Sequence, residues 1–289
     1  MAERMLYLDY AASTPVDASV LDRMREVAES NCANPSSTHA AGREAQDIIA
    51  AAAEQLGRLL NVHPGTLVWT SGATESDNLA IAGGARHRAH RGKHLVTMKT
   101  EHKAVTDMFE TLEKEGFEVT WVEPDSNGLV SPDVFAAALR DDTQLASIMF
   151  VNNETGVIQD IEALGSICRE RDVLFHVDGA QAVGKLPIDL GALPVDLLSL
   201  TGHKFYGPKG IGALYIADRP GCHVDPILFG GGQQRRIRPG TLPTDLVAGL
   251  GMAAEVAAGR IESDLEHLRD LRQALWEGIR CVDGVALNG

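Results

Sequence analysis

The sequence predicts an α/β fold built on a seven-stranded, mostly parallel sheet with one antiparallel strand. Short apolar runs recur along the chain with helical patterns between most of them, which is the alternation typical of a doubly wound sheet. The runs cover residues 67–70, 94–98, 118–122, 145–151, 173–177, 197–200 and 213–216. Because the loop between the last two runs is too short for a parallel crossover, the final strand should run antiparallel to its neighbour.

The ends of the chain predict a second, incomplete unit. Residues 6–8 resemble a short strand, a helix should begin near Asp17, residues 252–281 form a helical pattern and residues 285–287 resemble another strand. One strand and one helix cannot close a core of their own. We therefore expect a large domain over 14–250 and a partial small domain over 1–13 and 251–289.

Composition excludes several classes of function. The 289 residues are 44% hydrophobic, enough for a large core, and the 26 Lys and Arg against 40 Asp and Glu give a net charge of −14. An acidic surface repels nucleic acid and anionic lipid. No apolar run approaches the roughly 18 residues of a membrane helix, and the amino terminus lacks the apolar core of a signal peptide. A cytoplasmic protein is expected.

The four cysteines are scattered along the sequence. They are Cys32, Cys168, Cys222 and Cys281. None belongs to a CxxC pair or to a cluster of ligands, so neither a disulfide framework nor a metal site is indicated. Reduced thiols fit this pattern best.

A reactive lysine is expected in the loop that separates the last two strands. Lys204 follows Thr201, Gly202 and His203 at the carboxyl end of a predicted strand, where ligands of open α/β sheets bind. A partly buried site with neighbouring cationic groups such as His203 would lower the pKa of its amine and suit it to Schiff-base chemistry. The alternative is an ordinary solvated lysine.

A second loop has the pattern of an anion site. The strand at 67–70 leads into Ser-Gly-Ala-Thr and then an alanine-rich helix. The free N–H groups and the dipole at such a helix start attract phosphate, with the Thr74 hydroxyl as a further donor. The alternative is an ordinary cap, since Thr74 and Asp77 also have the spacing of a capping box. The loop at 31–39 is either part of the site or a dispensable surface loop.

Further polar residues follow the carboxyl ends of other strands. They are His102, Asn153, Asp178 and Gln181. Each alone has an ordinary explanation, such as a turn or a helix cap, but parallel strands should bring all of them to one rim. The set matches what pyridoxal 5'-phosphate requires: an amine, a phosphate-binding helix start and a carboxylate beside the pyridine nitrogen. Asp178 suits the last role, and His102 is able to stack on the ring and move protons.

The chain resembles the group I cysteine desulfurases of the class V aminotransferase family, which are fold type I pyridoxal phosphate enzymes. The matching stretches are LDYAASTP (8–15), NPSSTH (34–39), TSGATESDN (70–78), TEHKAV (100–105), VNNETG (151–156), HVDGAQ (176–181), GHKFYGPKG (202–210) and RPGTLP (238–243). They occur in the family's order from one end of this chain to the other, which makes the resemblance specific.

The resemblance implies a role for each candidate residue. Lys204 would carry the cofactor, His102 would be the ring-stacking acid/base, and Asp178 would pair with the pyridinium. Contacts to the ring oxygen or the substrate are implied at Gln181 and Asn153, and contacts to the phosphate at Ala73, Thr74, Thr201 and His203. Gly202 is a further cofactor-binding residue. The threonine that matches Thr241 reaches the phosphate of a neighbouring subunit in such enzymes, which implies a homodimer.

The resemblance also implies a reaction. Such enzymes convert L-cysteine to L-alanine and pass the sulfur, as an enzyme-bound persulfide, to an iron–sulfur scaffold or a tRNA-thiolation protein. The nucleophilic cysteine of the family sits in a carboxyl-terminal loop that this sequence lacks, so we expect a truncated desulfurase with little persulfide-forming activity. The alternatives are another reaction of the family, such as selenocysteine lyase, and a catalytically silent dimerising or scaffold-binding fragment.

Overall fold

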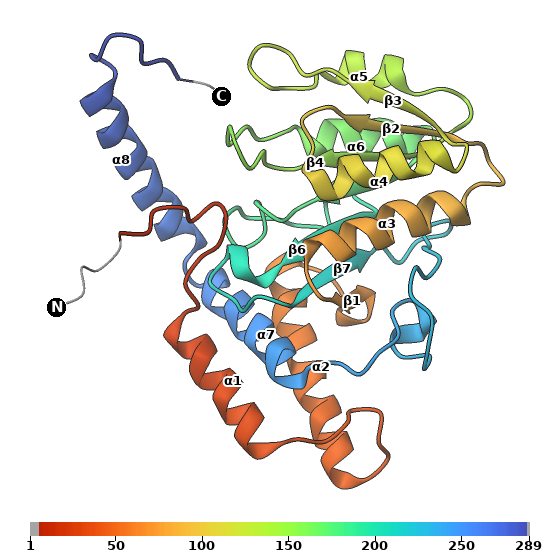
Figure 1. The fold of residues 1–289 in the computed structure, drawn as a ribbon, viewed down its shortest axis with the longest axis vertical. Helices are drawn as coiled ribbons and strands as arrows, with labels where there is room; N and C mark the ends of the chain where they lie inside the picture. The colour runs from red at the N-terminus through yellow and green to blue at the C-terminus, as the bar shows by residue number, and fades with distance from the viewer. Residues whose placement is uncertain (1–5, 288–289) are drawn as a thin grey trace.

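The computed structural model describes residues 6–287 and confirms the predicted α/β fold (Figure 1). Its sheet has seven strands in the order β1-β7-β6-β5-β4-β2-β3. The strands are β1 (Leu67–Thr70), β2 (His94–Met98), β3 (Glu118–Val122), β4 (Thr143–Met149), β5 (Leu174–Asp178), β6 (Leu197–Thr201) and β7 (Gly212–Ile216). Strand β7 pairs antiparallel with both β1 and β6, and the other pairs are parallel, as expected.

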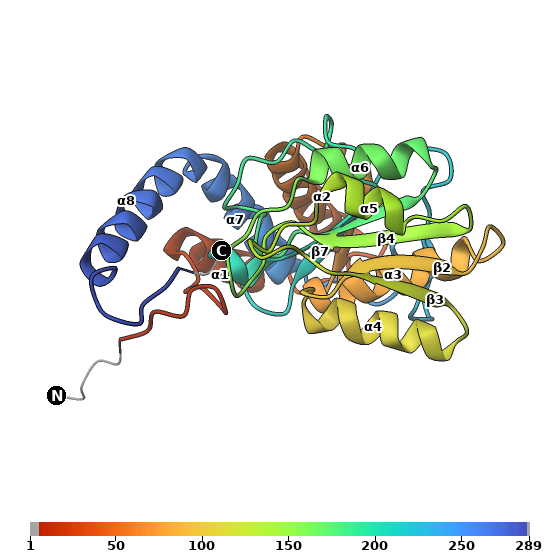
Figure 2. The ribbon, with the colours of Figure 1, turned by 90° about the horizontal axis from the view of Figure 1, so that it is seen from above.

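Helices cover both faces of the sheet (Figure 2). The helices are α1 (Ala18–Ser30), α2 (Ala40–Leu60), α3 (Ala73–His87), α4 (Lys103–Lys114), α5 (Pro132–Ala138), α6 (Ile161–Glu170), α7 (Thr244–Ala258) and α8 (Ile261–Ile279). Apolar residues of α3 and α4 pack with Leu95, Leu145 and Leu174 on one face of the strands. The alternate residues Val96, Ala146 and Phe175 pack on the other face with α2, α5, α6 and α7. This period-2 division of buried side chains fixes the register of the sheet.

Three predicted elements at the chain ends are wrong. Residues 6–8 form no strand, and Leu6 and Leu8 are about four-fifths exposed, because no neighbouring strand is there to pair with them. Residues 285–287 form no strand for the same reason. The single helix expected over 252–281 is two helices, α7 and α8, separated at Gly259, where glycine has a low helix propensity.

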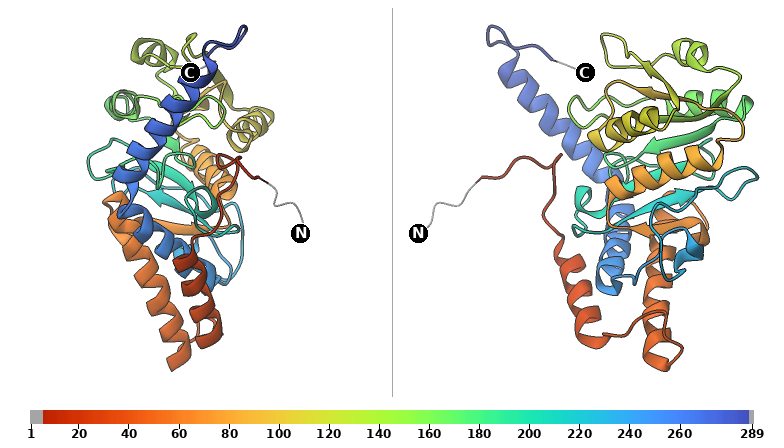
Figure 3. Two further views of the ribbon diagram at one scale, coloured as in Figure 1. Left: turned by 90° about the vertical axis from the view of Figure 1, so that its left-hand side faces the viewer. Right: turned by 45° about the vertical axis from the view of Figure 1, so that its right-hand side comes forward.

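Helix α8 extends away from the sheet (Figures 1 and 3). Its residues Leu268, Leu271 and Leu275 are more than half exposed, although they share one face of the helix. The domain division proposed from the sequence stays a prediction. None of the helices in residues 6–287 is long and apolar enough to cross a membrane.

The remaining boundaries agree closely with the sequence. Helix α1 begins after Asp17, whose carboxylate accepts a hydrogen bond from the Ser19 N–H at 2.9 Å. Helix α2 begins after His39, at the end of the loop that covers 31–39. Strand β4 begins and ends two residues earlier than expected, and Val151 makes only an isolated bridge to Ile158.

Candidate functional site

A cavity of about 830 Å³ lies at the carboxyl ends of the parallel strands. Its lining comes from the chain segment before α1, the β1–α3 turn, and the ends of β2, β4, β5 and β6. The predicted site residues that line it are Ala73, Thr74, His102, Asn153, Asp178, Gln181, Thr201, His203 and Lys204. Gly202 is buried between two lining residues, and Thr241 is exposed outside the cavity. Chain topology thus collects the predicted set on one rim.

Lys204 lies in a short 3₁₀ turn, η2 (Gly202–Lys204), directly after β6. Its Nζ donates a hydrogen bond to the Ala11 carbonyl oxygen at 2.8 Å. Burial lowers the pKa of this amine, and the negative charge of Asp178 partly opposes that shift. The side chain is therefore a half-buried amine facing a cavity and not an ordinary solvated lysine.

Burial, one of the two causes expected for the lysine shift, is the main cause, whereas the expected cationic neighbour His203 is not a cause. Burial and the nearby Lys204, Lys209 and Lys185 lower the pKa of His203, so its imidazole is neutral at pH 7 and supplies no positive charge. The His203 carbonyl oxygen instead accepts hydrogen bonds from the N–H and the hydroxyl of Thr14, at 2.8 and 3.0 Å. These bonds tie the lysine turn to the segment that precedes α1.

Three carboxyl groups are buried at the site, and two of them, Asp77 and Asp178, line the cavity. Asp178 ends β5 and accepts a hydrogen bond from the Ala180 N–H at 2.9 Å, yet burial raises its pKa. Glu101 accepts a bond from the Met149 N–H at 2.6 Å through one oxygen, while its other oxygen has no partner. Neither carboxylate oxygen of Asp77 has a hydrogen-bond partner, and burial and Asp178 raise its pKa well above the usual range.

Asp77 and Glu101 were not predicted as site residues. Asp77 appeared in the sequence only as a capping residue, and Glu101 only as a neighbour of His102. Asp77 lies one turn after Thr74 on the inner face of α3, a position that helical spacing alone makes visible once the anion turn is assigned to the cavity. The side chain of Glu101 points inward, away from solvent, because its oxygen caps the β4 strand end at Met149.

The β1–α3 turn has the form of an anion site. The N-cap of α3 is Gly72, which has φ of +151° and no side chain to satisfy the helix amides, so the capping box does not form. A Cβ atom at Gly212 would lie 2.7 Å from the Gly72 Cα, because β7 packs directly against this turn. Glu75 accepts a hydrogen bond from the Ser71 N–H at 2.7 Å and pairs with Arg238 at 2.7 Å. The close packing of β7 and the Glu75–Arg238 ion pair therefore fix the position of this turn.

The other rim residues are oriented by hydrogen bonds. His102 is the N-cap of α4, and its Nδ1 accepts a bond from the Ala104 N–H at 3.1 Å, which leaves Nε2 as the protonated nitrogen of the neutral ring. Gln181 donates to the Ala11 carbonyl oxygen at 2.8 Å and accepts a bond from Lys185 Nζ at 2.6 Å. Burial, reinforced by the charge of Lys204, lowers the pKa of Lys185 to about 8. Lys185 thus fixes the orientation of the Gln181 side-chain amide.

None of the cysteines lines this cavity, and all four lie within the described residues. Cys32 and Cys281 are exposed, and Cys168 is buried in α6. The Cys222 thiol contacts the Asp196 carbonyl oxygen at 3.5 Å, and burial raises its pKa to about 12. Buried, protonated thiols are poor nucleophiles.

Comparisons with known proteins agree with this geometry. The model of the family described as aminotransferase class-V matches residues 6–289. A cysteine desulfurase IscS of Serratia proteamaculans is 50% identical over 287 residues, which cover 98% of this chain and 71% of that protein. A cysteine desulfurase IscS of Neisseria meningitidis serogroup C is 50% identical over 285 residues.

Solved structures give the same result. A NifS-like protein has a TM-score of 0.92 at 36% identity, covering 96% of this chain and 76% of its own. The structure described as SspA in complex with cysteine has a TM-score of 0.84 at 45% identity, covering 87% and 72%. The chain belongs to the class V aminotransferase family, among its cysteine desulfurases.

Proposed function

We propose that this protein is a pyridoxal phosphate-dependent cysteine desulfurase that acts on L-cysteine through the cavity around Lys204. The observation that carries the proposal is the presence of an amine of lowered pKa, Lys204, and a buried carboxyl group, Asp178, in one cavity with a glycine-capped helix start. Membership in the family supports the same cofactor and substrate.

The residues of the cavity fit this cofactor. The cavity lining holds the carboxyl group of Asp77, whose oxygens have no partners, and that of Asp178, so a cationic ring nitrogen would oppose the burial that raises the pKa of both groups. The glycine-capped turn offers the α3 amides of Ala73 and Thr74 to a phosphate. Hydroxyl and imidazole groups of Thr201 and His203 lie on the same rim. The cationic ring nitrogen would therefore meet carboxyl groups, and the anionic phosphate would meet helix amides, hydroxyl groups and imidazoles.

Each rim residue has a defined task in this proposal. Asp178 would hold a proton on the ring nitrogen, and the bound group would then withdraw electrons from the substrate α-carbon. Lys204 Nζ, with its lowered pKa, would accept the α-proton at a pH where ordinary lysines are fully charged. His102 Nε2 would hold a proton at the rim of the cavity. Gln181 and Asn153 would orient the ring oxygen or the substrate.

The sulfur-accepting thiol is not part of this cavity. No cavity-lining residue in the described chain is a cysteine. We therefore expect the 289-residue chain to bind and activate L-cysteine without accumulating a persulfide at the site. The eventual acceptor would be an iron–sulfur scaffold or a tRNA-thiolation protein, as in the family.

Thr241 supports a homodimer in the proposal. It is exposed and lies outside the cavity of its own chain, which suits a residue that reaches the phosphate of a neighbouring subunit. The ion pair between Arg238 and Glu75 ties the segment before Thr241 to the anion turn. Light scattering of the purified protein should give twice the 30.9 kDa chain mass.

The attachment of the cofactor is testable by mass spectrometry. The protein would be incubated with pyridoxal phosphate, reduced with borohydride and digested, and the modified peptide would be identified. We expect one modification, on Lys204, that disappears in Lys204→Ala and persists in Lys103→Ala, whose lysine is 82% exposed on α4. Labelling distributed over surface lysines, unchanged in Lys204→Ala, would refute the proposal.

A further inference from the structure

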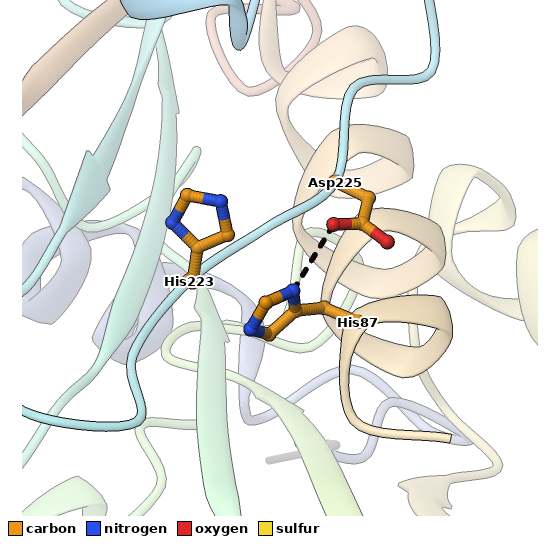
Figure 4. A group of neighbouring side chains, drawn as sticks. All are labelled: His87, His223 and Asp225. Atoms are coloured by element: carbon orange, nitrogen blue, oxygen red, sulfur yellow. Dashed lines mark hydrogen bonds and ion pairs between the residues drawn. The ribbon is translucent and has the colours of Figure 1, made fainter. Parts of the chain in front are cut away.

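Two histidines and an aspartate gather on the surface at the carboxyl-terminal end of α3 (Figure 4). His87 belongs to the last turn of that helix, and His223 and Asp225 belong to the segment that follows β7. We propose that these three residues form a binding site for a divalent transition-metal ion, with Zn²⁺ the best match. This site is separate from the cavity around Lys204.

The ligand atoms already converge. One nitrogen of each imidazole and one oxygen of the carboxylate all lie within 4.8 Å of one another. The His87 Nδ1 and the Asp225 Oδ1 are 3.0 Å apart, and the two imidazole centroids are 4.6 Å apart. Zinc ligands at about 2.0–2.2 Å from the metal stand roughly 3.3 Å from each other in a tetrahedron. The His223 side chain is exposed, so its rotation can bring the ligand atoms to the separation that zinc requires.

The backbone that carries the ligands is fixed against the helix. The Asp225 N–H donates to the Gly83 carbonyl oxygen at 3.1 Å, and a Cβ atom at Gly83 would lie 2.4 Å from the Asp225 carbonyl oxygen. Val224, between the two loop ligands, is fully buried. On the other side, Arg88 donates to the Gly221 carbonyl oxygen at 3.1 Å. Anchors on both sides of His223 preorganise the site, which lowers the entropy cost of binding.

The chemistry of the set selects the metal. Two imidazoles and a carboxylate suit zinc and its late first-row neighbours, and the partial exposure of the set leaves a coordination position for water. Cys222 precedes His223 but its thiol is directed at the Asp196 carbonyl oxygen, so it is not a ligand. The adjacent cations are engaged elsewhere: Arg86 pairs with Glu115 at 2.6 Å, and Arg88 pairs with Asp172 at 3.3 Å.

The position on α3 also favours a cation. The carboxyl-terminal end of a helix carries partial negative charge, which attracts positive ions. Helix α3 has 15 residues, so its two ends are roughly 22 Å apart, and a metal at His87 is remote from the cavity at Thr74. The ion would instead join the segment after β7 to α3. Further along, Arg238 of the same segment is paired with Glu75 at the other end of the helix, so the metal would add a second anchor.

Calorimetric titration of the purified protein with Zn²⁺, with and without pyridoxal phosphate, tests the proposal. We expect one site per chain that is weakened at least about 100-fold by His223→Ala or Asp225→Asn, because even removal of a group that only hydrogen-bonds to a metal ligand costs about 10–100-fold. His267→Ala, which removes an exposed histidine of α8, is the matched control and should bind as the wild type does. Equal affinities in wild type and His223→Ala would overturn the site.

Two further readouts separate this site from the thiols and from misfolding. The Co²⁺ complex should lack the thiolate charge-transfer absorption that cysteine ligands produce, and a strong thiolate band would contradict the ligand set. Zn²⁺ should slow the hydrogen exchange of amides in residues 219–228 in the wild type and leave that exchange unchanged in Asp225→Asn. If exchange there responds to Zn²⁺ equally in both proteins, the assignment is wrong.

Discussion

The buried carboxyl group of Asp77 is the most exacting test of the electrostatics of the cavity. The side chain is fully buried and neither oxygen has a hydrogen-bond partner. His176 Nε2 lies 3.5 Å away, but burial lowers the pKa of His176 to about 3, so the imidazole is neutral and forms no ion pair. The Ser199 hydroxyl, which is bonded to His176 at 2.9 Å, lowers the pKa of Asp77, but burial and the charge of Asp178 have larger effects and raise it.

Replacement by asparagine should therefore stabilise the cofactor-free protein at neutral pH. Asparagine leaves an unpaired polar group in the same place, but it has no proton to release when the chain unfolds. Asp77→Asn should therefore gain about 1.4 kcal/mol for each pH unit above the ordinary carboxyl pKa over which the folded Asp77 stays protonated. For a chain of this size that corresponds to a rise in Tm of roughly 2 °C or more per kcal/mol.

The stability of the wild type relative to Asp77→Asn should decrease as the pH rises. The folded-state pKa of Asp77 is raised, so the unfolded chain ionises first as pH increases from about 4, and the wild type loses stability relative to Asp77→Asn over the pH range above that value. Urea unfolding of both proteins between pH 5 and pH 8, with the exposed Asp47→Asn as control, measures this. A less stable Asp77→Asn at pH 7, with a difference independent of pH, would show that the carboxylate is well paired and refute the reasoning.

Three other predictions follow from the same geometry. His102→Asn keeps the helix cap but removes the acid/base imidazole, so the cofactor band of the loaded protein should shift with L-cysteine about 10²–10⁴-fold more slowly, with little change in Tm. In the wild type, the unfolding free energy should rise between about pH 8 and pH 10, because folded Lys185 loses its proton near pH 8 and the unfolded chain keeps that proton to higher pH. Lys185→Met should abolish this rise. Gly212→Ala should cost about 1–3 kcal/mol and weaken cofactor binding through its contact with Gly72, whereas Gly259→Ala, whose nearest neighbour would be 3.7 Å away, should do neither.

The part of the fold that the sequence predicts well is the part that alternates regularly. Each strand of the sheet has a short apolar run bounded by turn residues, and this pattern depends only on burial and on backbone pairing. The elements at 6–8 and 285–287 have the same local pattern. They fail because a strand needs a partner, and a partner is a property of the whole molecule.

The residues of the candidate site also divide into those that the sequence predicts and those that it misses. Lys204, Asp178 and His102 follow strand ends, so topology alone brings them together, and the structure lines one cavity with them. Asp77 and Glu101 were missed because their importance comes from burial without partners, which sequence spacing does not encode. The same holds for the group of His87, His223 and Asp225. His87 lies far from His223 and Asp225 in the sequence and meets them only because Gly83 admits the segment after β7.

The central claim is that Lys204 and its cavity hold pyridoxal phosphate and act on L-cysteine. The most direct measurement is the visible absorption spectrum of the 289-residue protein loaded with pyridoxal phosphate, recorded before and after L-cysteine, beside Lys204→Ala and Lys103→Ala. The account predicts a protein-bound cofactor band that shifts with L-cysteine in the wild type and in Lys103→Ala and is absent from Lys204→Ala. A band that is the same in Lys204→Ala, or one that does not respond to L-cysteine in the wild type, would contradict it.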